Sequence, residues 1–152
     1  MKLSTSQEEY LKAIYLLSNS HKEVRVTDIA SSLRITKPSV TKALKVLVEL
    51  GLINYESYGD ISLTNEGLEL SKSILKKYDI VKIFLKEILE VNDDHLDDDA
   101  ASIKSVISEE TLNKLEKYII STLKLSDLKC TCDMNNERCR KCIKLTKTKR
   151  SN

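Results

Sequence analysis

The chain has 152 residues, a length that fits one domain or a small domain with a helical extension. Its 41% hydrophobic and 32% charged residues are typical of a soluble globular protein, and no apolar run approaches the length needed to span a membrane. The net charge of +2 is uneven: residues 1–60 carry 8 basic and 7 acidic side chains, residues 61–128 carry 9 and 14, and residues 129–152 carry 8 and 2, so the acidic middle is a poor partner for DNA.

The N-terminal segment predicts an amphipathic helix that begins at Ser4 or Ser6 and stops at residues 18–20. The segment has no signal-peptide core, so we expect the protein to stay in the cytoplasm. Val24 and Val26 are expected to form a short strand that covers an open sheet edge.

Residues 27–51 have the pattern of two short helices joined by a tight turn. Thr27 can cap the first helix, residues 34–36 break the pattern, and Pro38 is tolerated in the first turn of the second helix. Gly51 stands where a left-handed C-cap is wanted. The apolar positions of the second helix are Val40, Leu44, Leu47 and Val48.

The other face of the second helix has the chemistry needed in a DNA major groove, because hydroxyls and ammonium groups can meet base edges and phosphates. Apolar and polar residues then alternate on both sides of residues 58–60, which predicts a hairpin, or wing, with Tyr58 at its tip. The segment therefore predicts a winged helix-turn-helix. The candidate DNA-contacting residues are Thr36, Lys37, Ser39, Thr41, Lys42, Lys45 and Tyr58.

Three more helices are predicted after the wing: one of about 25 residues, one over residues 92–107, and one capped by Ser108. The first is longer than a small DNA-binding domain needs, which favours a dimerisation arm over packing within one chain. Residues 97–99 with His95 resemble a metal cluster, but acidic residues near a helix start are favoured by the helix dipole, so we interpret them as solvated charges.

The segments EEYLKAIYLL, VTDIASSLRITKPSVTKALKVLVELGLINYESYGDISLTNEG and VISEETLNKLEKYI resemble the iron- and manganese-dependent repressors of the diphtheria toxin repressor and manganese transport regulator family. The resemblance covers roughly residues 6–122. It implies a homodimer that binds a palindromic operator, responds to a divalent metal and dimerises through the helices after the wing.

The resemblance places the family's metal ligands on residues that are mostly unsuited to the task. Only Glu9 keeps a carboxylate. The remaining family ligand positions fall on Lys12, Tyr78, Ala101, Lys104 and Ser105. Because an ammonium group offers a divalent ion no lone pair at neutral pH and alanine has no donor, we expect the family's iron or manganese site to be lost.

All four cysteines lie in the basic C-terminal segment, at Cys130, Cys132, Cys139 and Cys142. Four thiolates at this spacing can close a zinc site or hold an iron–sulfur cluster, and a reversible dithiol switch or an unstructured tail with incidental thiols are the other interpretations. In a reducing cytoplasm a structural disulfide framework is not expected.

The sequence thus predicts a mainly α protein: a winged helix-turn-helix DNA-binding domain over residues 1–64, a helical dimerisation domain over residues 65–124 and a Cys-rich tail over residues 125–152. We expect a transcriptional regulator, most simply a repressor, that binds double-stranded DNA as a homodimer with metal or redox input through the tail. The alternatives are a DNA-binding fold used as a protein-interaction scaffold, and a regulator that uses the family metal pocket near Glu9. No pattern of a catalytic site is present, so an enzyme is not expected.

Overall fold

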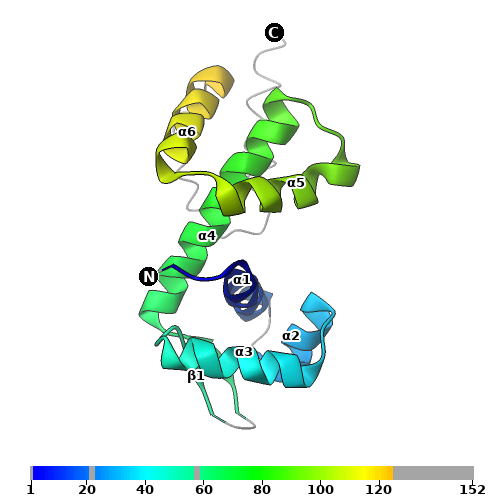
Figure 1. Ribbon diagram of the computed structural model, residues 1–152, viewed down its shortest axis with the longest axis vertical. Helices are drawn as coiled ribbons and strands as arrows, with labels where there is room; N and C mark the ends of the chain where they lie inside the picture. The colour runs from blue at the N-terminus through cyan, green and yellow to red at the C-terminus, as the bar shows by residue number, and fades with distance from the viewer. Residues whose placement is uncertain (1, 21–22, 57–58, 125–152) are drawn as a thin grey trace. The chain divides into compact units, whose positions relative to one another are not determined.

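The computed structural model of the chain describes residues 2–20, 23–56 and 59–124. This part of the chain forms six α-helices, one π-helical turn and a two-stranded sheet (Figure 1). It divides into two compact units, the first ending at Leu75 and the second starting at Lys76. The mainly α prediction is confirmed. None of the described helices combines the length and the apolar character needed to cross a membrane.

The first helix, α1 (Thr5–Ser20), begins with a reciprocal cap formed by Ser4 and Gln7. The Gln7 amide donates to the Ser4 hydroxyl at 3.3 Å, and the Ser4 amide donates to the Gln7 side-chain oxygen at 2.8 Å. The buried face of the helix carries Leu11, Ala13, Ile14 and Tyr15. The prediction of Ser4 as a helix start is therefore confirmed.

The helix-turn-helix consists of α2 (Val26–Leu33) and α3 (Lys37–Glu49). The prediction of Thr27 as the cap of α2 is wrong, because the N-cap is Arg25, two residues earlier, and the Asp28 carboxylate accepts from the Arg25 amide at 2.8 Å. Arg34 ends α2 in the left-handed region, with φ of 55°, and the chain turns there into α3.

The wing is an antiparallel pair of strands, β1 (Ile53–Tyr55) and β2 (Ile61–Leu63), with Ile53 opposite Leu63. The prediction of a third strand is wrong for Val26, which lies in α2. Val24 does lie beside the wing, where its carbonyl accepts from the Ile61 amide at 2.9 Å. Because one backbone hydrogen bond does not make a ladder, the described sheet stays two-stranded.

One apolar core holds these elements together. It takes residues from α1, from α2, from α3, from the wing and from the first half of the helix that follows the wing. Its side chains with the least exposure are Leu11, Ile14, Ile29, Val40, Leu44, Leu47 and Leu52. Val48, which the sequence pattern placed with them, is 39% exposed. The prediction of Val48 as an apolar-face residue of the core is therefore wrong.

The long helix α4 (Asn65–Ile83) begins against the backbone that leaves α3. The Thr64 hydroxyl donates to the Gly51 carbonyl at 2.8 Å and accepts from the Gly67 amide at 3.1 Å, and the Thr64 amide donates to the Leu52 carbonyl at 3.0 Å. Gly51 has a φ of 70°, which confirms the predicted left-handed residue after α3.

Gly67 lets the two segments approach closely. A Cβ atom at this position would overlap with the Leu52 carbonyl oxygen, and backbone atoms cannot rotate away as a side chain can. One turn later the buried Ser71 hydroxyl donates to the Gly67 carbonyl at 2.7 Å. The end of α3 and the start of α4 are thus joined by hydrogen bonds and a contact that only glycine permits.

The second unit contains the end of α4, a π-helical turn η1 (Phe84–Ile88), α5 (Asp93–Val106) and α6 (Glu109–Leu123). The long helix, the helix over residues 92–107 and the Ser108 cap were predicted and are confirmed. The Ser108 hydroxyl accepts from the Thr111 amide. The core of this unit consists of Ile80, Val81, Leu85, Leu96, Ala100, Leu112, Ile119 and Leu123.

We predict that Gly67→Ala lowers the free energy of unfolding by about 2 kcal/mol or more, because the backbone of α4 or of Leu52 must move to admit the methyl group. Ser73→Ala, on the exposed side of the same helix, is the matched control and should change stability by less than about 0.5 kcal/mol. Urea unfolding followed by circular dichroism measures both. Equal midpoints for the two variants would contradict the close approach.

Candidate DNA interface and the second unit

The candidate DNA interface is the solvent side of α3. Lys37, Lys42 and Lys45 are exposed there, while Val40, Leu44 and Leu47 on the opposite side are buried. The helix therefore has one side committed to the core and one side with three ammonium groups free of the core. Pro38 lies in the first turn, where its missing amide proton has no helical partner to lose.

The hydroxyls at the start of α3 are held in defined positions. Thr36 and Ser39 are both exposed, and their hydroxyl oxygens are 2.9 Å apart in a hydrogen bond. The Thr41 hydroxyl donates back to the Lys37 carbonyl at 3.0 Å and is half-buried. An oxygen that donates to its own helix still has lone pairs to accept with, so Thr41 can meet a donor on a base edge.

Arg34 is a residue that the sequence prediction did not include. It is exposed in the turn between α2 and α3, directly before the N-terminal end of α3. A guanidinium group in this place can pair with a backbone phosphate in two-point geometry. Its basic character in a predicted turn was the available signal. Tyr58 lies outside the described residues, so its predicted contact at the wing tip stays a prediction.

The positions onto which the resemblance maps the family's metal ligands carry few groups that could bind a cation. In α1, the Glu9 carboxylate pairs with the Lys12 ammonium at 2.6 Å. In the second unit Lys104 is buried, at 7% exposure, and the Ser105 hydroxyl donates to the Ser102 carbonyl. No group of three or more His, Cys, Asp or Glu side chains that could hold a metal ion occurs within residues 2–20, 23–56 and 59–124. These donors do not fit a divalent cation.

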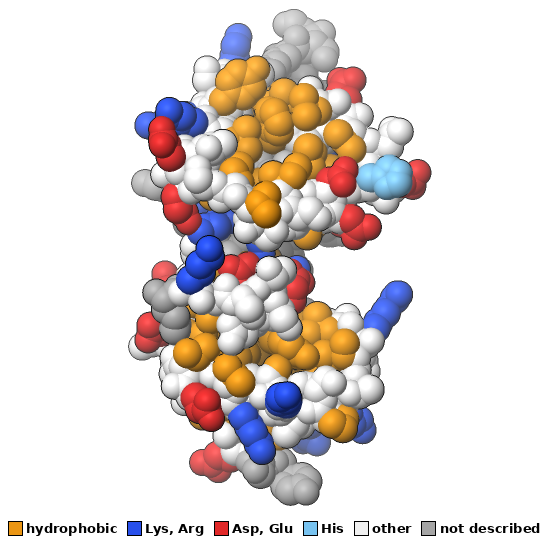
Figure 2. Space-filling model, in the orientation of Figure 1, with side chains coloured by type: hydrophobic (Ala, Val, Ile, Leu, Met, Phe, Trp, Pro, Cys, Tyr) orange, Lys and Arg blue, Asp and Glu red, His pale blue; other side chains and the backbone are white. Residues whose placement is uncertain are grey.

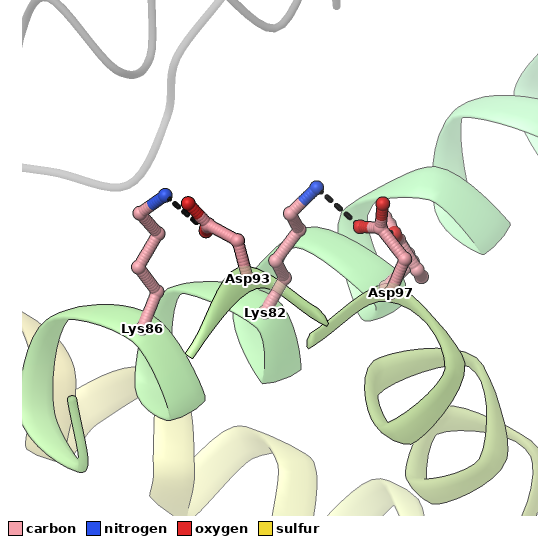
Figure 3. Close-up of polar contacts among 5 residues, drawn as sticks. Lys82, Lys86, Asp93 and Asp97 are labelled. Carbon is pink, nitrogen blue, oxygen red and sulfur yellow. Dashed lines mark hydrogen bonds and ion pairs between the residues drawn. The ribbon is translucent and has the colours of Figure 1, made fainter. Parts of the chain in front are cut away.

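Asp97 is bound to α4 and is more than a solvated helix-start charge. The Tyr78 hydroxyl donates to its Oδ1 at 2.6 Å and Lys82 Nζ approaches the same oxygen at 2.5 Å. Lys86 Nζ lies 2.7 Å from Asp93 Oδ1, and the two ion pairs lie side by side along α5 (Figure 3). Asp97 is solvated as expected, with 69% of its side chain exposed, but the prediction did not include its bonds to Tyr78 and Lys82. The four cysteines lie outside the described residues.

Apolar side chains are also exposed on the second unit. Figure 2 shows an area of apolar side chains on one face of this unit, with acidic side chains at its edge. Among the described residues of the second unit, the large apolar side chains with the most exposure are Val106 at 84%, Leu89 at 55% and Tyr118 at 54%. Tyr118 contacts Phe84 edge to face, with ring centroids 6.5 Å apart. Exposed apolar surface of this kind is typical of an association surface.

A DNA-binding winged helix-turn-helix followed by a separate helical unit defines a class of transcriptional regulators. Sequence comparison identifies the family: residues 2–61 match "Iron dependent repressor, N-terminal DNA binding domain", and residues 64–121 match "Iron dependent repressor, metal binding and dimerisation domain". The chain belongs to the iron-dependent repressor family. The predicted family, the DNA-binding function and the homodimer as partner are confirmed at this level.

Relatives with similar sequences are regulators too. An uncharacterised HTH-type transcriptional regulator of Methanocaldococcus jannaschii is 36% identical over 77% of this chain and 94% of its own length. The HTH-type transcriptional regulator MntR of Shouchella clausii is 32% identical over 72% of this chain and 76% of its own.

Solved structures show the same fold. The manganese regulator SloR superposes with a TM-score of 0.66 at 26% identity, over 74% of this chain. The metal-dependent regulator MtsR gives 0.70 at 21% identity, also over 74% of this chain. This chain spans about half the length of each of these two proteins, 53% in both cases.

The pKa of Asp79 in α4 is raised to about 6, because burial disfavours the charged carboxylate more than the nearby Lys82 ammonium favours it. The folded state therefore holds this proton more tightly than the unfolded chain. The contribution of Asp79 to stability should therefore fall as the pH rises from about 4 to about 6 and stay level above that range.

We predict that Asp79→Asn raises the free energy of unfolding at pH 7 by about 1–2 kcal/mol, since the variant no longer buries a charge, and leaves it nearly unchanged at pH 4. Asp98→Asn removes the same charge from an exposed site on α5 and controls for net charge. Urea unfolding at both pH values measures the difference. A gain for Asp79→Asn that is equal at pH 4 and pH 7 would contradict the raised pKa.

Proposed function

We propose that the protein represses transcription by reading a palindromic operator with the exposed face of α3. The observation that carries this proposal is the division of α3 into a fully buried apolar side and an exposed side with Lys37, Lys42 and Lys45. A helix held so firmly by its core can enter a major groove without rearrangement. Thr36, Ser39 and Thr41 meet base edges, and the lysines with Arg34 meet phosphates.

The acidic second unit supports a local contact of this kind. Since residues 61–128 carry 14 acidic against 9 basic side chains, the protein is attracted to DNA only where the lysines of α3 and the basic tail outweigh this charge. Two copies associated through the second unit supply two recognition helices, which doubles the number of phosphate contacts. The exposed apolar side chains of the second unit, which include Val106, Leu89 and Tyr118, are suited to this association.

A selection from randomised duplexes on the immobilised protein tests the proposal. We expect an inverted repeat whose halves are about one DNA turn apart, because a two-fold dimer presents its two α3 helices in that way. An enriched single half-site would contradict the dimer. Failure to enrich any sequence would favour the interaction-scaffold alternative.

We predict that Lys42→Ala weakens binding to the selected duplex roughly tenfold, about 0.7 kcal/mol for each of two subunits, and lowers the slope of log K against log salt by about two. A phosphate contact should weaken all sequences to a similar extent. Lys72→Ala, an exposed lysine on α4 of the same unit, is the matched control for charge. Fluorescence anisotropy over a range of salt concentrations measures both. Equal salt slopes for the two variants would contradict a phosphate contact at Lys42.

We also propose that the C-terminal segment carries the regulatory input through Cys130, Cys132, Cys139 and Cys142 as ligands of zinc or of an iron–sulfur cluster. The support comes from the sequence. Four thiols occur within thirteen residues, basic side chains such as Arg138 and Lys141 favour the thiolates, and the segment lies beyond residue 121, where the match to the family ends. The tail is thus an addition to the shared domains.

We predict that protein purified without oxygen contains either one zinc per chain and no colour, or iron and sulfide with broad visible absorption. An absorption spectrum with metal analysis distinguishes the two. The variant with all four cysteines replaced by serine should lose the bound metal and the response of DNA binding to metal or oxidant. Metal-free wild-type protein whose DNA binding equals that of the four-serine variant under every condition would contradict a role for the cysteines.

A further inference from the structure

In the second unit, three side chains of α4 and η1 bind α5 directly. Tyr78 and Lys82 share Asp97, and Lys86 pairs with Asp93 (Figure 3). Lys82 Nζ also lies 5.6 Å from the centroid of the Tyr78 ring, a cation–π distance. These three contacts join the two helices at successive turns of α5.

The Lys82–Asp97 pair differs from an ordinary surface salt bridge. The Lys82 side chain is only 11% exposed, so this ammonium is largely withdrawn from water and is compensated by the carboxylate and the ring. Loss of Asp97 would leave a half-compensated buried charge. The contact is therefore a fixed part of the unit.

A second buried lysine, Lys104, lies in α5 of the same unit. This region falls within the match to the family's metal-binding and dimerisation domain. The family resemblance places Tyr78 and Lys104 at positions where family members have metal ligands. The only one of these positions that keeps a carboxylate is Glu9 in α1, and it forms an ion pair with Lys12. Positive charge from the protein thus occupies positions where the family has metal ligands, and it would repel a divalent cation.

We propose that this protein has exchanged the divalent cation of its family for its own ammonium groups, so that the second unit folds and α3 binds DNA without iron or manganese. Tyr78 and Lys82 join α4 to α5, Lys86 joins η1 to α5, and Lys104 is a buried lysine of α5. The DNA part of this inference rests on the proposed function; the folding part does not.

The folding part is tested on the full chain with all four cysteines replaced by serine, which removes metal binding by the tail. Thermal unfolding is followed in 1 mM EDTA and in 1 mM MnCl2 or, without oxygen, FeSO4. We expect melting temperatures within about 1 °C of each other. A rise of roughly 5 °C or more, as for a site saturated about 100-fold above its Kd, would overturn the proposal.

Tyr78→Phe tests the direct α4–α5 bond. It removes one hydroxyl and should lower the melting temperature by about 2–4 °C, equally in EDTA and in MnCl2. Tyr10→Phe in α1 is the matched control, since the half-buried Tyr10 hydroxyl makes no hydrogen bond among the described residues, and it should change little. A loss for Tyr78→Phe that manganese reverses would overturn the proposal.

A reconstructed ligand set provides the converse test. The variant Tyr78→His, Ala101→Glu, Lys104→Glu and Ser105→His should unfold at a lower temperature in EDTA, because it buries carboxylates, and should regain stability with MnCl2. If it does not fold in EDTA, refolding on addition of manganese is the same readout. Equal responses of this variant and the parent chain to manganese would overturn the proposal.

The DNA part is tested on the same four-serine chain, by running the duplex selection in parallel in 1 mM EDTA and in 1 mM MnCl2. We expect the same inverted repeat in both, with Kd values within about twofold. Enrichment only with manganese would overturn the metal-independence while leaving the proposed function intact. Enrichment in neither would refute the proposed function, and the melting experiments would still decide the folding part.

Discussion

The contact between the start of α4 and the backbone that leaves α3 sets the geometry of the DNA-binding unit. Thr64 spans it with three hydrogen bonds, to Gly51, Leu52 and Gly67, and the missing side chain of Gly67 allows it. Because the contact is made by backbone atoms, it has little freedom to adjust. A change in the direction of α4 in this region would therefore move the backbone at the C-terminal end of α3.

The same arrangement explains how a chain with an acidic middle can bind DNA. The core residues Val40, Leu44 and Leu47 fix the position of α3 before it binds DNA. Because binding then does not have to order the helix, a few contacts with DNA can be enough, and no large basic surface is needed. Arg34, Lys37, Lys42 and Lys45 are then a small set of charges in defined places. In the proposed interface, such a set would make affinity sensitive to salt and specificity dependent on the hydroxyls of Thr36 and Ser39.

Much of the fold could be predicted from local pattern, and the parts that could not depend on contacts distant in sequence. The apolar spacing of α3, the left-handed Gly51 and the Ser108 cap are local signals, and each is present in the structure. Thr27 looked like a cap, but the Asp28 carboxylate accepts from the Arg25 amide and the helix starts earlier. The pairing of Lys82 with Asp97 bridges 15 residues and depends on how α4 packs on α5, which no spacing rule reveals. The roles of the α3 residues remain predictions because they concern a partner outside the chain.

A metal ion between two helices does two separable things: it neutralises the carboxylates around it, and it holds the helices together. On the proposal made here, Lys82 and Lys86 perform both tasks for Asp97 and Asp93, with which they form ion pairs. An ammonium group cannot be withdrawn from the protein as a cation can, so this part of the structure would not respond to a metal. The regulatory input would then enter at a different place. The cysteine-rich segment beyond the shared domains has the chemistry to provide it, and it can evolve without disturbing the core of either unit because it lies outside both family matches.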